Sequence, residues 1–444
     1  MGNRFVGFCG GFSGHFRLCT RDVFTQCQQY LSGLMQARKK NMERMAEVVS
    51  RSDEQALQHF LSNSTWDERG VLDQVALEAD GWLGGADDSA LLIDESGVTK
   101  KGKKSVGVAR QWNGRLGKVD NCQVGVYAAL SRGRVSTLID TRLYLPASWV
   151  EDEARCTGAG VPRQARRLRS KPELALEMVR YNRRLGVRFS WVGMDGLYGK
   201  DPALLRALEA DGETFVADVH KDQYVYLEDP RPVVPASLPG RGRKRTRGVA
   251  HSEKLRVDAW SAAQPQSAWT RVELGDSTKG KLRVEVLHRR VWLWDGKEPQ
   301  ARHWHLIVRR EIKAHDEIKF SLSNAPQDLP LQRLAQRQSQ RYWVERSFQD
   351  GKSQAGLDHY QARGWKAWHH HMALVMMAML FMLKERIAHH EEHPLLSCAD
   401  IETLLAHFLP RRDVDVEEVI RQMEVRHHKR QASIDFAYAK QLLE

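Results

Sequence analysis

Two short apolar runs, each closed by an aspartate, constrain the fold more than any other feature of the sequence. Residues 90–93 precede Asp94, and residues 189–194 precede Asp195. Continuous apolar runs of this length are typical of strands that are buried on both faces. If the two strands lie side by side and parallel, both carboxylates emerge at the same edge of the sheet. The pattern therefore predicts an α/β domain with two acids at one sheet edge.

The hydrophobic period changes along the chain and divides its first half into two regions. In residues 1–88 the apolar positions repeat at three and four, which predicts a helical N-terminal DNA-binding region. Ordinary helical packing explains those helices equally well. In residues 89–220 several strand patterns come first, and then helix and strand alternate, which favours a mixed sheet.

A stretch rich in proline, glycine and arginine, residues 229–249, has the composition of a linker and marks a boundary. Strand patterns without a long helix surround it, so residues 221–322 are predicted to form an all-β insertion. Helical patterns then return. Residues 323–390 are predicted to complete the core and to include a buried helix, and residues 391–444 to form a C-terminal helical region.

The charge of the chain points to a polyanionic partner. It has 68 Lys and Arg against 56 Asp and Glu, which gives a formal net charge of +12. The surplus gathers in short runs, which suits contact with the phosphates of nucleic acid. Such contacts position DNA without reading its sequence. The predicted phosphate contacts in these runs are Lys100, Lys101, Arg241, Arg243, Lys244, Arg245 and Arg247.

Three further observations bear on location. The six cysteines have no spacing of a zinc site. The longest apolar run, residues 372–383, is too short to cross a bilayer, and the N-terminus lacks the plan of a secretory signal. We therefore expect a cytoplasmic protein of bacterial type.

A third acid, Glu345, lies in a helical pattern. Arg341 precedes it by four positions and Lys352 follows it by seven, so the three side chains share one helical face. A carboxylate between two cations suits a site in which the acid binds a metal ion and the cations bind phosphates. A solvated helix with ion pairs explains the same spacing, and the spacing alone favours that simpler interpretation.

Three sequence blocks surround these acids. Asp94-Glu-Ser-Gly is followed by Lys100-Lys-Gly, Ser-Val-Gly-Val-Ala-Arg-Gln and Gly-Lys-Val-Asp-Asn-Cys-Gln-Val-Gly. Asp195-Gly-Leu-Tyr-Gly forms the second block, and Glu345 with its two cations forms the third. Together they resemble the catalytic blocks of bacterial insertion-sequence DDE transposases, over roughly residues 5–390. In the third block Gln338 stands where the family's Tyr-Arg-Glu-Lys signature has its tyrosine, which leaves that tyrosine's phosphate contact open.

The resemblance implies an RNase H-like mixed-sheet core, interrupted by the β-strand insertion. It implies that Asp94, Asp195 and Glu345 are catalytic and bind two Mg²⁺ ions, which Mn²⁺ can replace. Further residues that it implies for phosphate or DNA binding are Arg341, Lys352 and Tyr198.

The resemblance also implies a substrate and an assembly. The substrate is double-stranded DNA, both the terminal inverted repeats of the transposon and the target DNA. The assembly is a homodimer in a synaptic complex that moves the element by cut and paste, with or without hairpinned ends. No membrane is involved, and the active protein is associated with the nucleoid.

Two other functions fit the same residues. One is a catalytically idle DNA-binding regulator derived from a transposase, whose binding would be indifferent to Mg²⁺ and to Asp94→Asn. The other is an RNase H-like nuclease that cuts DNA without strand transfer.

Other acids compete with the three. Glu95 neighbours Asp94, but consecutive strand residues point to opposite faces, so we expect a structural or surface role. Asp140 and Asp218 lie in or near strand patterns and are predicted to be hydrogen-bonded or edge acids. Asp350 lies five positions from Glu345, off its helical face, and is a minor alternative.

Histidines and tryptophans offer two more candidates. Residues 369–371 are three consecutive histidines, and in a helix they fan out by about 100° each, so they cannot clamp one ion. Partial burial or DNA contact is the better prediction. Trp292, Trp294 and Trp304 are predicted to be core residues of the insertion, with a flipped DNA base as the alternative partner.

Overall fold

The apolar runs before Asp94 and Asp195 form neighbouring parallel strands. β1 (Ser89–Thr99) and β5 (Trp191–Met194) pair with Ala90 opposite Trp191 and Ile93 opposite Met194. Asp195 follows the last residue of β5, whereas β1 continues past Asp94 to Thr99, still paired with β3, so the prediction that the first strand ends at Asp94 is wrong. The two acids nevertheless lie side by side, where the pairing of β1 with β5 ends.

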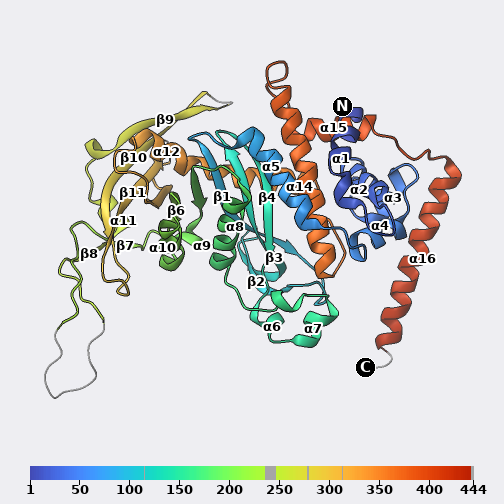
Figure 1. Cartoon of the computed structure of the whole chain (residues 1–444), viewed down its shortest axis with the longest axis horizontal. Coiled ribbons are helices and arrows are strands. Elements are labelled where there is room, and N and C mark those ends of the chain that lie inside the picture. Colours follow the sequence, from blue (N-terminus) through green and yellow to red (C-terminus); the bar gives the residue numbers. More distant parts are fainter. Residues whose placement is uncertain (115, 236–246, 278–279, 313, 442–444) are drawn as a thin grey trace. The chain divides into compact units, whose positions relative to one another are not determined.

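The computed structural model describes residues 1–114, 116–235, 247–277, 280–312 and 314–441 (Figure 1). These residues form two compact units. Unit 1 consists of Met1–Glu68, Gly351–Ala362 and Lys366–Glu444, and unit 2 of Arg69–Asp350 and Arg363–Trp365.

The sheet of unit 2 begins with a mixed core. Its strand order is β4-β3-β1-β5-β6, with β3 antiparallel to β1 and β4, and with β5 parallel to β1 and β6. This order is consistent with the predicted RNase H-like core. The other strands of this part are β2 (Ala109–Asn113), β3 (Lys118–Arg132), β4 (Val135–Leu143) and β6 (Phe215–Val219).

Helices around this core begin and end where the sequence provides caps. α8 (Lys171–Leu185) packs on β3 and β4. It starts with a capping box between Ser170 and Glu173 and ends at Gly186, whose φ of +100° favours glycine. The remaining helices are α5 (Glu68–Leu83), α6 (Ala147–Val150), α7 (Glu153–Gly158), η2 (Arg163–Ala165), α9 (Gly196–Gly199) and α10 (Pro202–Ala210).

The predicted insertion consists mainly of strands. β12 (Ile318–Ser323) pairs antiparallel with β6, so the strands of the insertion continue the core sheet instead of forming a separate one. A longer antiparallel ribbon follows on the far side of β12 (Figure 1). Its elements are β7 (Tyr224–Tyr226), β8 (Lys254–Arg256), α11 (Val257–Ala262), η3 (Gln266–Ala268), β9 (Thr270–Ser277), β10 (Gly280–Leu293) and β11 (Arg302–Glu311).

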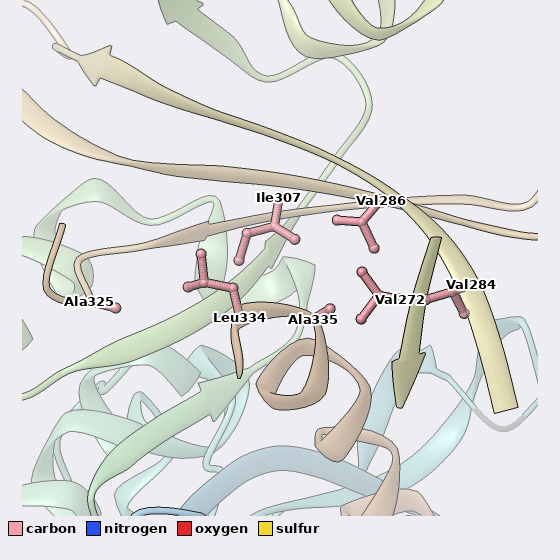
Figure 2. Close-up of a cluster of buried hydrophobic side chains, with 7 residues drawn as sticks. All are labelled: Val272, Val284, Val286, Ile307, Ala325, Leu334 and Ala335. Carbon is pink, nitrogen blue, oxygen red and sulfur yellow. The ribbon is translucent and has the colours of Figure 1, made fainter. Parts of the chain in front are cut away.

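A small apolar core joins this ribbon to α12 (Leu331–Gln340). Leu334 and Ala335 of α12 are buried beside strand residues of β9, β10 and β11, together with Ala325 (Figure 2). Burial of such side chains stabilises the contact by about 1.5–3 kcal/mol for each large one. The strand residues are Val272, Val284, Val286 and Ile307. α12 is followed directly by α13 (Tyr342–Ser353), which carries Glu345.

Unit 1 is helical. Its long helix α14 (Trp365–Ala388) is buried along residues 372–383, in agreement with the predicted buried helix. None of the described helices combines the length and the apolar character needed to cross a membrane. The other helices are α1 (Gly2–Gly11), η1 (Ser13–Phe16), α2 (Phe24–Gln36), α3 (Met42–Val48), α4 (Glu54–Ser62), α15 (Cys398–Phe408) and α16 (Val416–Gln441).

Two of the three consecutive histidines are core residues of unit 1. His370 is buried, is stacked on Trp66 with 3.8 Å between ring centroids, and contacts the carbonyl oxygens of Leu61 and Trp66. His371 is also buried and lies 2.8 Å from the Tyr30 hydroxyl. Burial, one of the two predicted alternatives, therefore accounts for both side chains.

Candidate active site

Three carboxylates meet at the edge of the sheet where β1 and β5 lie side by side. Asp94, Glu95 and Asp195 each place one oxygen within 4.8 Å of the others. Asp195 also caps α9, since its Oδ1 accepts a hydrogen bond of 2.9 Å from the Leu197 amide. The structure thus brings two of the predicted catalytic acids together.

The position of Glu95 corrects the expectation that it points away from Asp94. β5 pairs with β1 only as far as Ile93, so none of the described strands pairs with β1 on this side beyond that residue. The longer Glu95 side chain can turn round the open edge toward the same point. Its Oε1 accepts a hydrogen bond of 2.9 Å from Lys171, the first residue of α8.

Burial and neighbouring carboxylates raise the pKa values of Asp94 and Asp195. Burial raises the pKa of Asp94 well above its usual range, and the nearby charge of Asp195 adds to the rise. Burial and the charge of Glu95 raise the pKa of Asp195, while the Arg341 cation opposes both shifts. An all-oxygen group of crowded carboxylates is the donor set that a hard divalent cation prefers, so these residues fit such an ion.

Arg341 connects the third acid to this group. Its guanidinium donates from Nε to Asp218 Oδ2 at 2.8 Å and from Nη2 to Glu345 Oε1 at 3.2 Å, and Nη1 lies 3.8 Å from Asp94 Oδ2. Glu345 itself is outside the close group of three acids, and 51% of its side chain is exposed. The structure therefore places Glu345 beside the pair through a shared cation.

Helix α13 is fixed by its opposite face. Val344 and Phe348 are buried, and the Phe348 ring meets the Tyr127 ring of β3 at 5.2 Å, edge to face. Ser347 Oγ lies 2.7 Å from Ser136 Oγ of β4. These contacts leave Glu345 on the exposed side of the helix.

A chain of hydrogen bonds holds Asp218, the carboxylate that binds Nε of Arg341. Ser321 Oγ of β12 donates to Asp218 Oδ1 at 2.6 Å, and Gln338 Nε2 of α12 donates to Ser321 Oγ at 2.7 Å. Asp218 is thus a hydrogen-bonded acid, as predicted. Gln338, at the position of the expected signature tyrosine, is buried and serves this internal chain. A phosphate contact from that position is not part of the arrangement.

The Tyr-Gly pair of the second block has a steric explanation. A Cβ on Gly199 would lie only 1.9 Å from the Asp218 carbonyl oxygen, so only glycine lets α9 approach β6 this closely. Tyr198 is fully buried, and its pKa is raised well above its usual value by burial and by the carboxylates of Glu95, Asp94 and Asp195. Tyr198 therefore lies among the acids in the interior, away from the surface position that a direct DNA contact needs.

The sequence comparisons agree with this geometry. A family model described as DDE superfamily endonuclease matches residues 12–281, which is more than half of the chain. The chain belongs to this family. Its similarity to a probable transposase for insertion sequence element IS701 from Microchaete diplosiphon is 25% identity over 331 residues, covering 73% of this chain and 74% of the relative. The expected resemblance to insertion-sequence DDE transposases is thereby confirmed.

The family match includes Asp94 and Asp195 and ends before Glu345. Members of the DDE superfamily use divalent metal ions, and the oxygen group around Asp94 fits that chemistry. The family match therefore does not cover Glu345. What links Glu345 to the two aspartates in this DDE superfamily member is its contact with Arg341.

The other predicted DNA contacts of this family member are spread over the chain. Lys101 and Arg247 are exposed, and Lys100 is half-buried. Lys352 lies in the last turn of α13, within unit 1, whereas Glu345 belongs to unit 2. Four predicted contacts lie outside the described residues: Arg241, Arg243, Lys244 and Arg245.

The competing acids have partners elsewhere. Asp140 is fully buried and binds Arg69 at 2.7 Å, Asn182 at 3.1 Å and also Arg142. Burial alone would raise its pKa, but the cations of Arg142 and Arg69 outweigh burial and lower it. Asp350 pairs with Arg346 at 3.1 Å. Neither acid belongs to the group around Asp94.

A cavity of about 620 Å³ lies in unit 2, between the segment after Asp195 and the insertion. Trp304 is buried and donates to Glu209 Oε1, so it is a core residue. Trp292 stacks on His303 at 4.4 Å, and both Trp294 and Trp304 line the cavity. The sequence patterns did not reveal this mixture of aromatic and basic side chains, which includes Lys200, Tyr224, Lys254, Trp294 and Arg302.

Proposed function

We propose that this protein is the transposase of an insertion sequence, which binds the terminal inverted repeats of its element, cleaves the DNA with Mg²⁺ and transfers the cut strands to target DNA. The observation that carries the proposal is the meeting of Asp94 and Asp195 at one sheet edge, with Arg341 linking Glu345 to them. Family membership and the transposase relative support the same reading.

Asp94, Asp195 and Glu345 are proposed to hold two Mg²⁺ ions, which Mn²⁺ can replace. Such ions, when bound, supply Lewis acidity to the attacking and leaving oxygens. Arg341 and Lys352 are proposed to hold neighbouring phosphates, so that the scissile bond is oriented for in-line attack. Since Asp218 binds Nε of Arg341, the outer nitrogens of the guanidinium keep a fixed direction.

DNA is proposed to bind through several surfaces. The residues 1–88 and the basic linker would contact the terminal repeats, and the aromatic and basic cavity of the insertion suits stacking and phosphate binding. The synaptic complex is proposed to be a homodimer that acts in the cytoplasm, associated with the nucleoid. The proposed roles of the other regions are core for residues 89–220 and 323–390, insertion for 221–322 and C-terminal region for 391–444, although the second part of 323–390 belongs mostly to unit 1.

The proposal is tested by incubating the full-length protein with end DNA, a target plasmid and either Mg²⁺ or EDTA. Joined products that need Mg²⁺ are expected. Cleavage without joined products would instead identify a nuclease that lacks strand transfer. End binding without cleavage, indifferent to Mg²⁺ and to Asp94→Asn, would identify a DNA-binding regulator.

Arg341→Lys is expected to slow cleavage of end DNA by about 100-fold, because lysine lacks the planar fork that contacts Asp218, Glu345 and Asp94 together. Single-turnover cleavage rates measure the effect. Arg180→Lys is the control, since Arg180 forms a comparable fork with Asp211 on the surface. Equal cleavage rates for the wild type and the Arg341 variant would show that Arg341 has no role in cleavage.

A further inference from the structure

The carboxylate nearest to the Asp94 and Asp195 pair is that of Glu95, not that of Glu345. The close oxygens of all three lie within 4.8 Å of one another, whereas Glu345 is held on the outer side by Arg341. Six oxygens are the usual number around Mg²⁺, and carboxylates supply only some of them. The arrangement therefore offers a three-acid group before Glu345 takes part.

Two buried oxygens at this point have unused hydrogen-bonding capacity. Lys171 binds Glu95 Oε1, while Glu95 Oε2 is buried and has no hydrogen-bond partner among the described residues. The Tyr198 hydroxyl is likewise buried without a well-formed hydrogen bond within the described part of the chain, and it interacts with Glu95, which contributes to the raised pKa of Tyr198. An unsatisfied buried polar group costs about 1–3 kcal/mol, so a cation and its bound water would satisfy both groups at this point.

The local charge favours a cation as that ligand. Carboxylates outnumber the cations around the site among the described residues. The carboxylates belong to Asp94, Glu95, Asp195, Asp218 and Glu345, and the cations are Arg341, Lys171 and, beside Asp218, Arg309. A divalent ion reduces the repulsion among the acids, and its bound water can satisfy a hydroxyl such as that of Tyr198.

We propose that Glu95 is a further metal ligand, which binds the first divalent ion together with Asp94 and Asp195 before DNA arrives. Lys171 holds Oε1 and thereby directs Oε2 toward the two aspartates. Glu345 completes the site only when Arg341 releases it toward the substrate. This inference rests on the proposed metal-dependent function.

The experiment titrates Mn²⁺ into the full-length protein without DNA in a calorimeter, which measures the affinity for the ion. Glu95→Gln is expected to weaken Mn²⁺ binding at least about tenfold. Lys171→Met is expected to tighten it about threefold or more, because a competing cation is removed. Glu177→Gln, which removes an acid from the surface pair with Arg169, is the control and should match the wild type within about twofold.

The two variants are expected to change the Mn²⁺ affinity in opposite directions, which distinguishes a metal ligand from a structural ion pair. If Glu95→Gln and Lys171→Met weaken binding equally, Glu95 acts only through its pair with Lys171 and the inference is wrong. If Glu95→Gln binds like the wild type while Asp195→Asn does not, the inference is again wrong, but the proposed function stands. If Asp195→Asn also binds Mn²⁺ like the wild type, the proposed metal site itself fails.

Glu95→Asp is a second variant that distinguishes the loss of a metal ligand from a folding defect in Glu95→Gln. It keeps the charge and shortens the side chain by one methylene, so Mn²⁺ affinity between those of the wild type and Glu95→Gln is expected. Circular dichroism and the unfolding temperature are recorded for each variant. Wild-type affinity in a folded Glu95→Gln protein would overturn the assignment.

Discussion

Asp195→Asn is expected to reduce cleavage of end DNA by at least about 10³-fold while leaving binding of the ends unchanged. The substitution removes one negative oxygen from the group formed with Asp94 and Glu95. Loss of a metal ligand removes several kcal/mol of charge stabilisation in the transition state, and each 1.36 kcal/mol corresponds to a factor of ten in rate. Single-turnover cleavage and a gel-shift titration measure the two effects separately.

Asp201→Asn provides a matched control for this change. Asp195 caps α9 and Asp201 caps α10, and in each case the side-chain oxygen accepts from backbone amides. Asparagine caps helices about as well as aspartate, so neither variant should lose its helix. Only the Asp195 variant should lose cleavage. Comparable rates in both variants would exclude Asp195 from catalysis.

Asp140→Ala is expected to lower the free energy of unfolding by about 3 kcal/mol, because it leaves Arg69 and Arg142 without their shared buried partner. Urea unfolding at pH 7 measures the loss. Since the pKa of Asp140 is lowered in the folded state, its contribution is complete above the ordinary aspartate range and is lost as the pH falls through the lowered value. The difference in the free energy of unfolding between the Asp140 variant and the wild type should therefore decrease only below about pH 4.

The surface pair of Asp211 with Arg180 supplies the comparison for Asp140. Both of its side chains are partly exposed, so Asp211→Ala should cost no more than about 1 kcal/mol. An equal loss in the two variants would show that burial of Asp140 adds nothing to the strength of its network.

The two parallel strands and the aspartate after each apolar run could be predicted from the sequence because their signal is local, although β1 continues past Asp94 to Thr99. An apolar run followed by Asp94 or Asp195 gives strand, burial and edge position at once. The resemblance then supplied the RNase H-like core and the third acid, Glu345. The mixed sheet and the family match agree with the predicted core. The family match ends before Glu345, whose role as the third acid stays a prediction.

The surroundings of the site could not be predicted, because their partners are far apart in the chain. Arg341 meets Asp218 across 123 positions, and Ser321 reaches the same carboxylate across 103. Periodicity states which face a residue occupies but not which distant side chain faces it. For Glu95 the period-two rule states the direction of the Cβ atom, but it does not limit where the end of a long side chain lies, and the Glu95 carboxylate comes close to Asp94 and Asp195.

The pairing of β12 with β6 connects the insertion to the residues that hold Arg341. Its final strand places Ser321 opposite Asp218, so one residue belongs both to the appendage and to the scaffold of Arg341. A chimera that carries a different insertion therefore has to retain residues 318–323. A junction placed before β12 keeps the hydrogen bond from Ser321 to Asp218, whereas a junction placed after β12 removes it.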